Sequence, residues 1–213
     1  GTKPEEATPT PTVLLALEPF GNAQLREIAS LDPEWELHSI RPGSEWAHFY
    51  QRVDDKRVKR RFRNVLTGDT ISIDWDVRGV VDVTADDRYL WANGQLWPNF
   101  ELHVVDLETG ERVRLITADD LDGNHPYQCN ASPFSPHVLI YAARPESQWW
   151  LADTDGSHLR RLPIERGEDV IGWSAEGEII LLRELEVQAL DPDTGQRRLI
   201  RELPRRGAVK LSG

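Results

Sequence analysis

The residues best suited to do chemistry gather in one polar segment, residues 117–126. It contains His125 and, just before it, four side chains with oxygen ligands: Asp119, Asp120, Asp122 and Asn124. Carboxylate and amide oxygens are the hard ligands that Ca²⁺ prefers, and an imidazole can bind a metal or transfer a proton near neutral pH. The segment lacks the distal glutamate of an EF-hand loop. Two interpretations therefore stand: a divalent-metal site, or an acidic loop whose carboxylates face water. We expect no cofactor, with a divalent metal as the alternative.

Other catalytic signatures are missing from the sequence. It contains no Gly-x-Ser-x-Gly elbow, no phosphate-cradling glycine-rich loop and no His-Glu-x-x-His pair. Cys129 is the single cysteine, so neither an internal disulfide nor a cysteine-based zinc site can form. It lies among alternating apolar residues, which predicts a small buried side chain rather than a nucleophile. We assign no catalytic residue from these patterns.

Composition and charge narrow the class of partner. The 213 residues are 39% apolar and 29% charged, and no apolar run is long enough for a membrane-spanning helix. The formal net charge of −11 repels phosphate backbones and argues against nucleic acid as a partner. Residues 56–63 are basic, but Val58 and Phe62 alternate within them. This pattern favours a strand with a solvated basic face over a patch for an anionic ligand.

The chain changes character after residue 12. Residues 1–12 are rich in threonine and proline and offer almost nothing to bury, which predicts an extended linker. Residues 13–213 show short apolar runs between turn signals, which predicts an all-β domain. Such linkers often tether an outer domain to a membrane anchor. We therefore expect a tethered protein without direct membrane insertion, in the periplasm or at the cell surface, with the cytoplasm as the alternative.

A hairpin signature recurs along the β domain. An Asp or Asn begins a tight turn and a glycine closes it, as in Asp106-Leu-Glu-Thr-Gly110 and Asp191-Pro-Asp-Thr-Gly195. Glycine supplies the positive φ that a short hairpin loop needs, and the Asp side chain can accept turn N–H groups. The turn glycines, separated by 39 to 47 residues, are Gly21, Gly68, Gly110, Gly156 and Gly195. Strand-only repeats of this length are typical of β-propeller blades.

The repeat also resembles a known family. The stretch Ser132-Pro-Phe-Ser-Pro-His-Val-Leu-Ile-Tyr, followed by Leu151-Ala-Asp-Thr-Asp-Gly156, resembles the WD40-like bacterial repeat of TolB-type propellers, with Pro136-His137 where that repeat usually has Asp-Gly. The resemblance implies four-stranded antiparallel blades. We place them at about residues 35–76, 78–117, 126–163 and 168–203. Residues 13–31 supply two strands of a fifth, closing blade shared between the termini, to which residues 208–211 add a strand; the alternative is a fragment of a larger propeller.

The positions of the tryptophans fit the expected blades. Five tryptophans in or beside the expected strands should pack between neighbouring blades: Trp75, Trp91, Trp149, Trp150 and Trp173. Because adjacent strand residues point to opposite faces, Trp149 and Trp150 should contact different neighbours.

One blade is also similar to those of a propeller enzyme family. His125-Pro126, Leu139-Ile-Tyr141 and Arg144-Pro-Glu146 are similar to a blade of oligogalacturonate lyases. This similarity implies metal-dependent β-elimination on pectic oligosaccharides. His125 alone falls at a matching ligand position.

Propeller topology brings distant residues to one face. The connection between two blades and the central hairpin loop of each blade lie on the same side, where propellers usually bind ligands. Three loops of this chain should meet there, and their candidate binding residues are Trp97, Asn99, Asp119, Asp120, Asp122, His125 and Arg144.

Three functions fit the sequence. The first is a non-catalytic binding or scaffold propeller that holds a protein, peptide or glycan at this face. The alternatives are a carbohydrate-active, metal-dependent lyase and a structural repeat unit of a larger ring or oligomer. The oligomeric state is left open.

Overall fold

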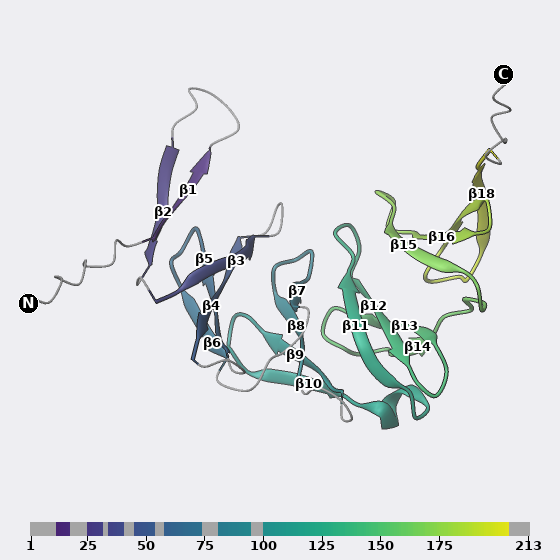
Figure 1. Cartoon of the computed structure of the whole chain (residues 1–213), viewed down its shortest axis with the longest axis horizontal. Coiled ribbons are helices and arrows are strands. Elements are labelled where there is room, and N and C mark those ends of the chain that lie inside the picture. Colours follow the sequence, from purple (N-terminus) through teal and green to yellow (C-terminus); the bar gives the residue numbers. More distant parts are fainter. Residues whose placement is uncertain are drawn as a thin grey trace, which may run out of the picture. The chain divides into compact units, whose positions relative to one another are not determined.

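We analysed a computed structural model of the chain. It describes residues 12–17, 25–31, 34–40, 45–53, 58–73, 81–94 and 100–204. The chain divides into two compact units, residues 1–78 and 79–213. The described residues form β-strands, with one short 3₁₀ helix in the second unit (Figure 1). No helix in the described ranges is both long and apolar enough to cross a membrane.

The first unit contains a strand pair and one four-stranded sheet. β1 (Thr12–Leu17) pairs antiparallel with β2 (Leu25–Leu31). The sheet consists of β3 (Glu36–Ile40), β4 (Trp46–Arg52), β5 (Val58–Asn64) and β6 (Thr70–Ile73) in chain order. The predicted basic strand is confirmed as β5. Its Phe62 is buried and stacks on His48, while the guanidinium of Arg61 lies 4.0 Å from the ring centre of Trp35.

The second unit contains three four-stranded antiparallel sheets in which neighbours along the chain pair with each other. The first sheet comprises β7 (Val81–Val83), β8 (Tyr89–Asn93), β9 (Leu102–Asp106) and β10 (Arg112–Ile116). The second comprises β11 (His125–Ala131), β12 (His137–Ala143), β13 (Gln148–Asp153) and β14 (Arg160–Arg161). The third comprises β15 (Asp169–Trp173), β16 (Ile179–Arg183), β17 (Glu186–Leu190) and β18 (Arg197–Glu202).

These sheets confirm the predicted blades. Each of the four predicted blade ranges contains one four-stranded meander, and residues 13–31 supply the predicted pair of strands. The expected closing strand at residues 208–211 lies outside the described residues, as does Trp75.

The recurring turns have the predicted geometry. In the β9–β10 hairpin, the Asp106 carboxylate accepts the N–H of Glu108 at 2.8 Å, and Gly110 has a φ of +75°. The β17–β18 hairpin repeats this arrangement, with the Asp191 carboxylate accepting the Asp193 N–H at 2.8 Å. Hydrogen bonds from the N–H groups of Thr194 and Asp193 hold the pKa of Asp191 below its usual value.

Neighbouring blades of the second unit are joined by apolar side chains. Those between the first and second sheets include Trp91, Leu102, Val104, Val138, Ile140 and Trp150. Those between the second and third sheets include Leu139, Leu151, Ile179, Leu181 and Leu190, with Trp149 and Trp173 packed beside them. Adjacent residues of β12 and β13 therefore face opposite neighbours, and the predicted division of Trp149 from Trp150 is confirmed. Cys129 is buried in the first group, and this burial raises the pKa of its thiol.

The first and second sheets of the second unit also make a close polar contact. The indole N–H of Trp91 donates to the carbonyl of Thr154 at 2.8 Å. In the same hairpin, a Cβ placed on Gly156 would lie 2.9 Å from the Arg114 side chain. Gly156 also has a φ of +83°, so the turn and the close approach both favour glycine.

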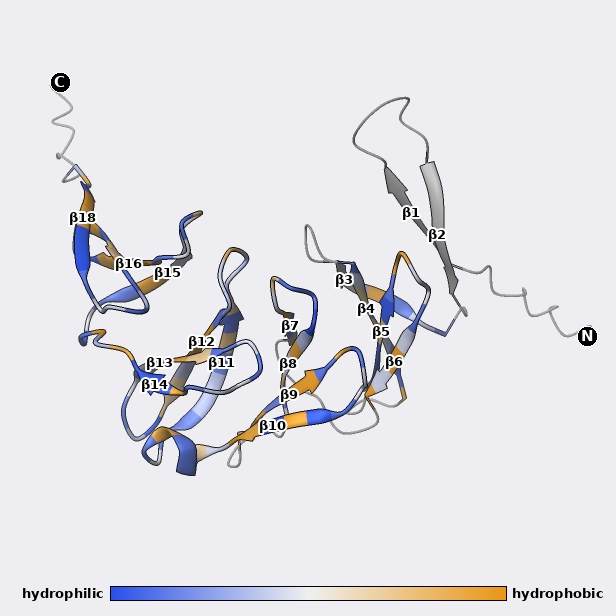
Figure 2. Cartoon of the chain, turned by 180° about the vertical axis from the view of Figure 1, so that it is seen from behind, coloured by the Kyte–Doolittle hydropathy of each residue, from blue (hydrophilic) through white to orange (hydrophobic). Residues whose placement is uncertain are grey.

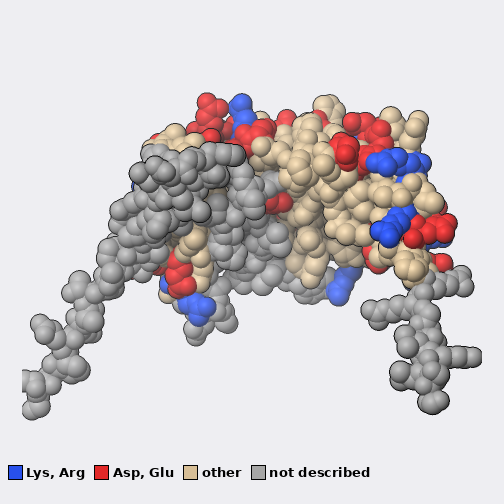
Figure 3. All heavy atoms as spheres, turned by 90° about the horizontal axis from the view of Figure 1, so that it is seen from above, with Lys and Arg blue, Asp and Glu red and all other residues tan. Residues whose placement is uncertain are grey.

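The outer strands carry polar and apolar side chains, and Val113 of β10 and Leu199 and Ile200 of β18 are exposed. Hydrophobic and hydrophilic residues alternate along β10 (Figure 2). On the face in Figure 3, acidic and basic side chains lie next to one another. Ion pairs among the described residues include Arg88 with Asp106, Arg114 with Asp120 and Arg198 with Glu178.

Candidate functional site

The acidic segment forms a tight turn. Residues 118–121 form the 3₁₀ helix η1 (Ala118–Leu121), and Asp122 ends it in the left-handed region with a φ of +53°. The Asp120 carboxylate accepts the Thr117 N–H and an Arg114 N–H, both at 2.9 Å. These bonds give Asp120 a structural role in the turn. The side chain of Asp119 is exposed.

The metal hypothesis gains no support from this geometry. Across the described parts of the chain, no group of three or more His, Cys, Asp or Glu side chains is arranged to hold a metal ion. A divalent metal at this turn stays a prediction. Trp97 and Asn99, two further candidates, lie outside the described residues.

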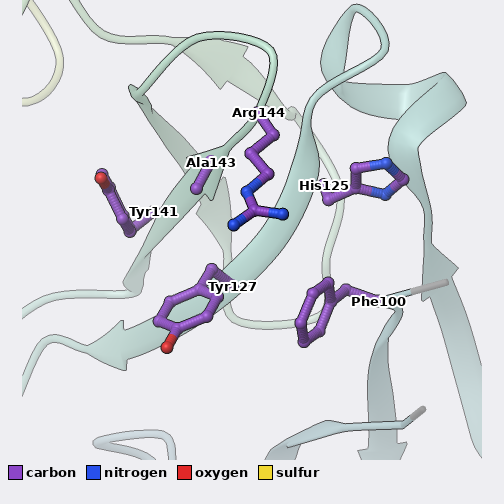
Figure 4. Close-up of a pocket in the computed structure, with 6 residues that line it drawn as sticks. All are labelled: Phe100, His125, Tyr127, Tyr141, Ala143 and Arg144. Carbon is purple, nitrogen blue, oxygen red and sulfur yellow. The ribbon is translucent and has the colours of Figure 1, made fainter. Parts of the chain in front are cut away.

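Two other predicted residues do come together. A cavity of about 560 Å³, which we call the aromatic pocket, is lined by Phe100, His125, Tyr127, Tyr141, Ala143 and Arg144 (Figure 4). His125 begins β11, and Arg144 follows the last residue of β12. In Figure 4, the Arg144 side chain extends between the rings of Tyr127 and His125. The predicted face of the blade thus carries a cavity, and rings that the sequence did not suggest supply most of its walls.

A β-bulge explains why Tyr127 reaches this pocket. β11 pairs with β12 through Pro126 and Ala142, then through Gln128 and Tyr141, so Tyr127 is an extra residue in the ladder. A bulge bends its strand and redirects a side chain. The Tyr127 side chain is 54% exposed, which is unusual for a large ring in a strand.

Four aromatic rings form a continuous series across the blade. Phe100 meets Tyr127 with ring centres 5.7 Å apart at an interplanar angle of 66°, and Tyr127 meets Tyr141 at 6.4 Å and 88°. Tyr141 then contacts Trp149, its cross-strand partner in β13, at 4.9 Å and 45°. Such edge-to-face contacts stabilise aromatic pairs, so the series holds the pocket wall in one arrangement.

The backbone around Arg144 is fixed by the neighbouring turn. The Arg144 carbonyl accepts the His125 N–H at 3.2 Å. The buried amide of Asn124 accepts the Glu146 N–H and donates to the Leu121 carbonyl, both at 3.0 Å. Asn124 therefore joins two of the predicted loops through its amide.

A second cavity lies beside the first. Its volume is about 770 Å³, and we call it the ion-pair cavity. It is lined by Tyr141 and Trp149, by residues 145–147 and by residues 161 and 164–170. Tyr141 thus lines both cavities. In a propeller, the connections between blades lie on the face that usually binds ligands, and the connection between β14 and β15 is one of them. Its run of charged residues is a signal in the sequence that our prediction of the site did not use.

Two carboxylates that line the ion-pair cavity, Glu165 and Glu168, are paired with arginines of the protein. The side chain of Glu168, only 1% exposed, is bound by both terminal nitrogens of Arg197 and by the N–H of Glu165. Burial alone would raise the pKa of Glu168, but the Arg197 and Glu165 hydrogen bonds outweigh it and hold the pKa below its usual value. Glu165 in turn pairs with Arg183 at 2.8 Å.

Comparison with known proteins identifies the fold. No protein-family model matches the sequence, and no curated protein matches it. A TolB-type protein from Agrobacterium tumefaciens is similar in structure, with a TM-score of 0.54 and 15% identity over 90% of this chain and 74% of that one. The chain has a TolB-type β-propeller fold. The family resemblance found in the sequence is confirmed at the level of fold.

Other propellers of this kind have diverse functions. The β-propeller domain of the Trilobed protease from Pyrococcus furiosus has a TM-score of 0.55 and 15% identity, over 79% of this chain and 58% of that one. Dihydro-heme d1 dehydrogenase NirN has a TM-score of 0.56 and 16% identity, over 85% of this chain and 40% of that one. The chain thus spans about half the length of these two neighbours, and at such identities the likeness concerns the propeller fold alone.

Proposed function

We propose that this propeller is a non-catalytic binding module that holds a peptide segment of a partner protein in the aromatic pocket. The observation that carries the proposal is the exposed, bulge-presented ring of Tyr127 beside Arg144 in a cavity of about 560 Å³. Ligand sites typically combine apolar walls with a few placed polar groups at volumes of about 300–1,000 Å³. Tyrosine and arginine are also the residues that most often dominate binding energy at protein interfaces.

The chemistry of the wall favours binding over covalent catalysis. The described lining offers His125 and the phenols of Tyr127 and Tyr141 as proton-transferring groups, and it contains no carboxylate, thiol or primary hydroxyl group. Covalent catalysis needs an activated nucleophile, and most of the side chains that serve as one are absent from this described lining.

The ring geometry favours a peptide over a glycan. A sugar stacks on a flat, open ring face, whereas Phe100, Tyr127 and Tyr141 meet at 66° and 88°. Rings at such angles form corners that accept an apolar side chain of a peptide. Exposed tyrosines are well suited to this use because they bury a large area and lose little conformational freedom.

The linker suggests where the module acts. The threonine- and proline-rich residues 1–12 have the composition of an extended tether. We therefore place the module outside the cytoplasm, held near a membrane by this tether. Cell fractionation with an antibody against the propeller would test this placement, and a cytoplasmic fraction would contradict it.

Selection from a random peptide library tests the binding proposal. The full chain, immobilised, should enrich peptides whose affinity falls at least tenfold for Tyr127→Ser. Phe134→Ser is the matched control, because Phe134 is a similarly exposed ring (58%) in the β11–β12 connection, outside both cavities. The proposal fails if no peptide is enriched, or if Tyr127→Ser binds the peptides as well as Phe134→Ser does. It also fails if a glycan array, and no peptide, gives signals that depend on Tyr127.

A further inference from the structure

We propose that the basic face of β5, in the first unit, holds a phosphate group that is bound by Arg61 and Arg63 with Lys59 beside them. This site goes beyond the proposed function and is independent of it, because the aromatic pocket belongs to the second unit. The phosphate group comes either from a free phosphate in solution or from a phospholipid headgroup, and both sources present the same oxygens.

The alternation of β5 gathers three basic residues on one face. Lys59, Arg61 and Arg63 are each two positions apart in the strand, so they share a face. The cross-strand partners of the two arginines in β6 are Ser72 and Thr70, which place two hydroxyl-bearing residues on the same face. Same-face neighbours in a strand are about 6.6 Å apart. Two guanidinium groups at this spacing can both reach one ligand.

The two arginines are held against the sheet. Lys59 is exposed, as expected for a solvated basic face, whereas Arg61 and Arg63 are half-buried. The Nε atom of each arginine is buried and has no hydrogen-bond partner in the described structure. The Arg61 guanidinium also lies 4.0 Å from the ring centre of Trp35. A ring contact of this kind occupies the flat face of a guanidinium and leaves its in-plane N–H groups able to donate to a ligand.

The charges of these arginines are not matched by the described acids. No described carboxylate forms an ion pair with Arg61 or Arg63, whereas arginines of the second unit that pair with carboxylates include Arg88, Arg160 and Arg183. Carboxylates of the first unit accept hydrogen bonds from uncharged side chains, as in Glu34 with Gln51, Glu36 with Tyr50 and Glu45 with Asn64. A half-buried guanidinium without a carboxylate is costly, and an anion from outside would offset that cost.

A single phosphate group fits this face better than other anions. A carboxylate presents two oxygens in one plane and matches the fork of one guanidinium. A phosphate ester presents three acceptor oxygens that point in different directions, so it can accept from both arginines and from a hydroxyl group. A nucleic acid brings a long row of phosphates, which the net charge of −11 repels.

Two assays on the full chain test the site and separate the two sources. Isothermal titration calorimetry with inorganic phosphate, against sodium chloride at the same ionic strength, tests free phosphate. Flotation with vesicles of phosphatidylglycerol and phosphatidylcholine, against vesicles of phosphatidylcholine alone, tests the headgroup. We expect saturable binding in at least one assay, and the assay that shows it identifies the source. Arg61→Gln and Arg63→Gln should each weaken this binding roughly tenfold or more, the size of a charge-assisted hydrogen bond.

Arg52→Gln is the matched control. Arg52 is an exposed arginine at the end of β4. It lies on the opposite face, because it is three positions from Phe49, the cross-strand partner of Arg61. This variant should bind like the natural protein. Arg63→Gln leaves the contact between Arg61 and Trp35 in place, so it keeps the test valid if a thermal melt shows that Arg61→Gln is unfolded. The proposal is overturned if neither assay shows binding, or if Arg63→Gln binds as well as Arg52→Gln does.

Discussion

The aromatic pocket and the ion-pair cavity share Tyr141 and one loop, with Arg144 lining the first and the next three residues lining the second. They differ in how their charged groups are used. In the ion-pair cavity, Glu168 is buried against Arg197 and Glu165 pairs with Arg183. In the aromatic pocket, the rings of Phe100, Tyr127 and Tyr141 supply most of the described wall, with Arg144 and His125 beside them. A cavity with internally matched charges stabilises the fold, whereas exposed rings beside one cation are suited to an external ligand.

The largest expected effect is on stability, in the ion-pair cavity. Glu168→Gln leaves the guanidinium of Arg197 without its buried partner, and breaking such pairs costs about 3–5 kcal/mol. Urea unfolding should show a loss of about 3 kcal/mol. Glu165→Gln, in the same cavity but on an exposed pair, should cost less than about 1 kcal/mol. Equal losses for the two variants would contradict the difference between the buried and the exposed ion pair.

A smaller loss of stability is expected from substitution of Asn124, whose amide joins the two loops. Asn124→Ala leaves the Glu146 N–H and the Leu121 carbonyl without their partner, at a cost of about 1–3 kcal/mol. Peptide affinity should also fall several-fold, because Arg144 loses its support although Asn124 does not line the pocket. Asn124→Asp keeps the acceptor and should recover part of the affinity. Unchanged binding in Asn124→Ala would show that the loop needs no such support.

Acid should reduce the stability contributed by Glu168 in the ion-pair cavity before it affects the aromatic pocket. The folded pKa of Glu168 lies below its ordinary value of 4.5, so the folded state binds a proton less readily than the unfolded state. The stabilisation is therefore fully present above about pH 4.5 and is lost as the pH falls through the folded pKa. Unfolding free energies measured from pH 6 to pH 3 should fall less steeply for Glu168→Gln than for the natural protein. Parallel curves would contradict this assignment.

The smallest stability effect is expected in the aromatic pocket itself. Tyr127 is 54% exposed, so Tyr127→Ser should change the free energy of unfolding by about 0.5 kcal/mol or less, although it abolishes most peptide binding. A thermal melt measures the change in stability, and a binding titration measures the loss of peptide affinity. A large loss of stability would mean that Tyr127 is a packing residue and would remove the contrast between the cavities.

The fold could be predicted because its signals are local. A turn such as Asp106 to Gly110 needs an Asp that accepts turn N–H groups and a glycine at positive φ, and both are visible in the sequence. Strand alternation correctly separated Trp149 from Trp150. These features depend on residues close together in the chain.

The site was predicted only in part because it depends on pairing between strands. Topology alone placed His125 and Arg144 on one face, and they line one cavity. Tyr127 was missed because its exposure follows from a bulge in the β11–β12 register, which strand alternation does not reveal. Ligand binding by Asp120 stays a prediction, and the hydrogen bonds that its carboxylate accepts within the turn were not visible in the sequence. The similarity of one blade to oligogalacturonate lyases, in which His125 alone falls at a matching ligand position, stays a prediction.

Hydrogen exchange with a bound peptide tests the central claim most directly. The full chain would be compared with and without a saturating amount of the tightest peptide from the selection. The account predicts slower exchange in two segments, residues 123–129 around Tyr127 and residues 140–147 around Arg144, and no change in residues 132–136 around Phe134. Protection confined to residues 132–136 or to the first unit would contradict it, because the ligand would then occupy another surface.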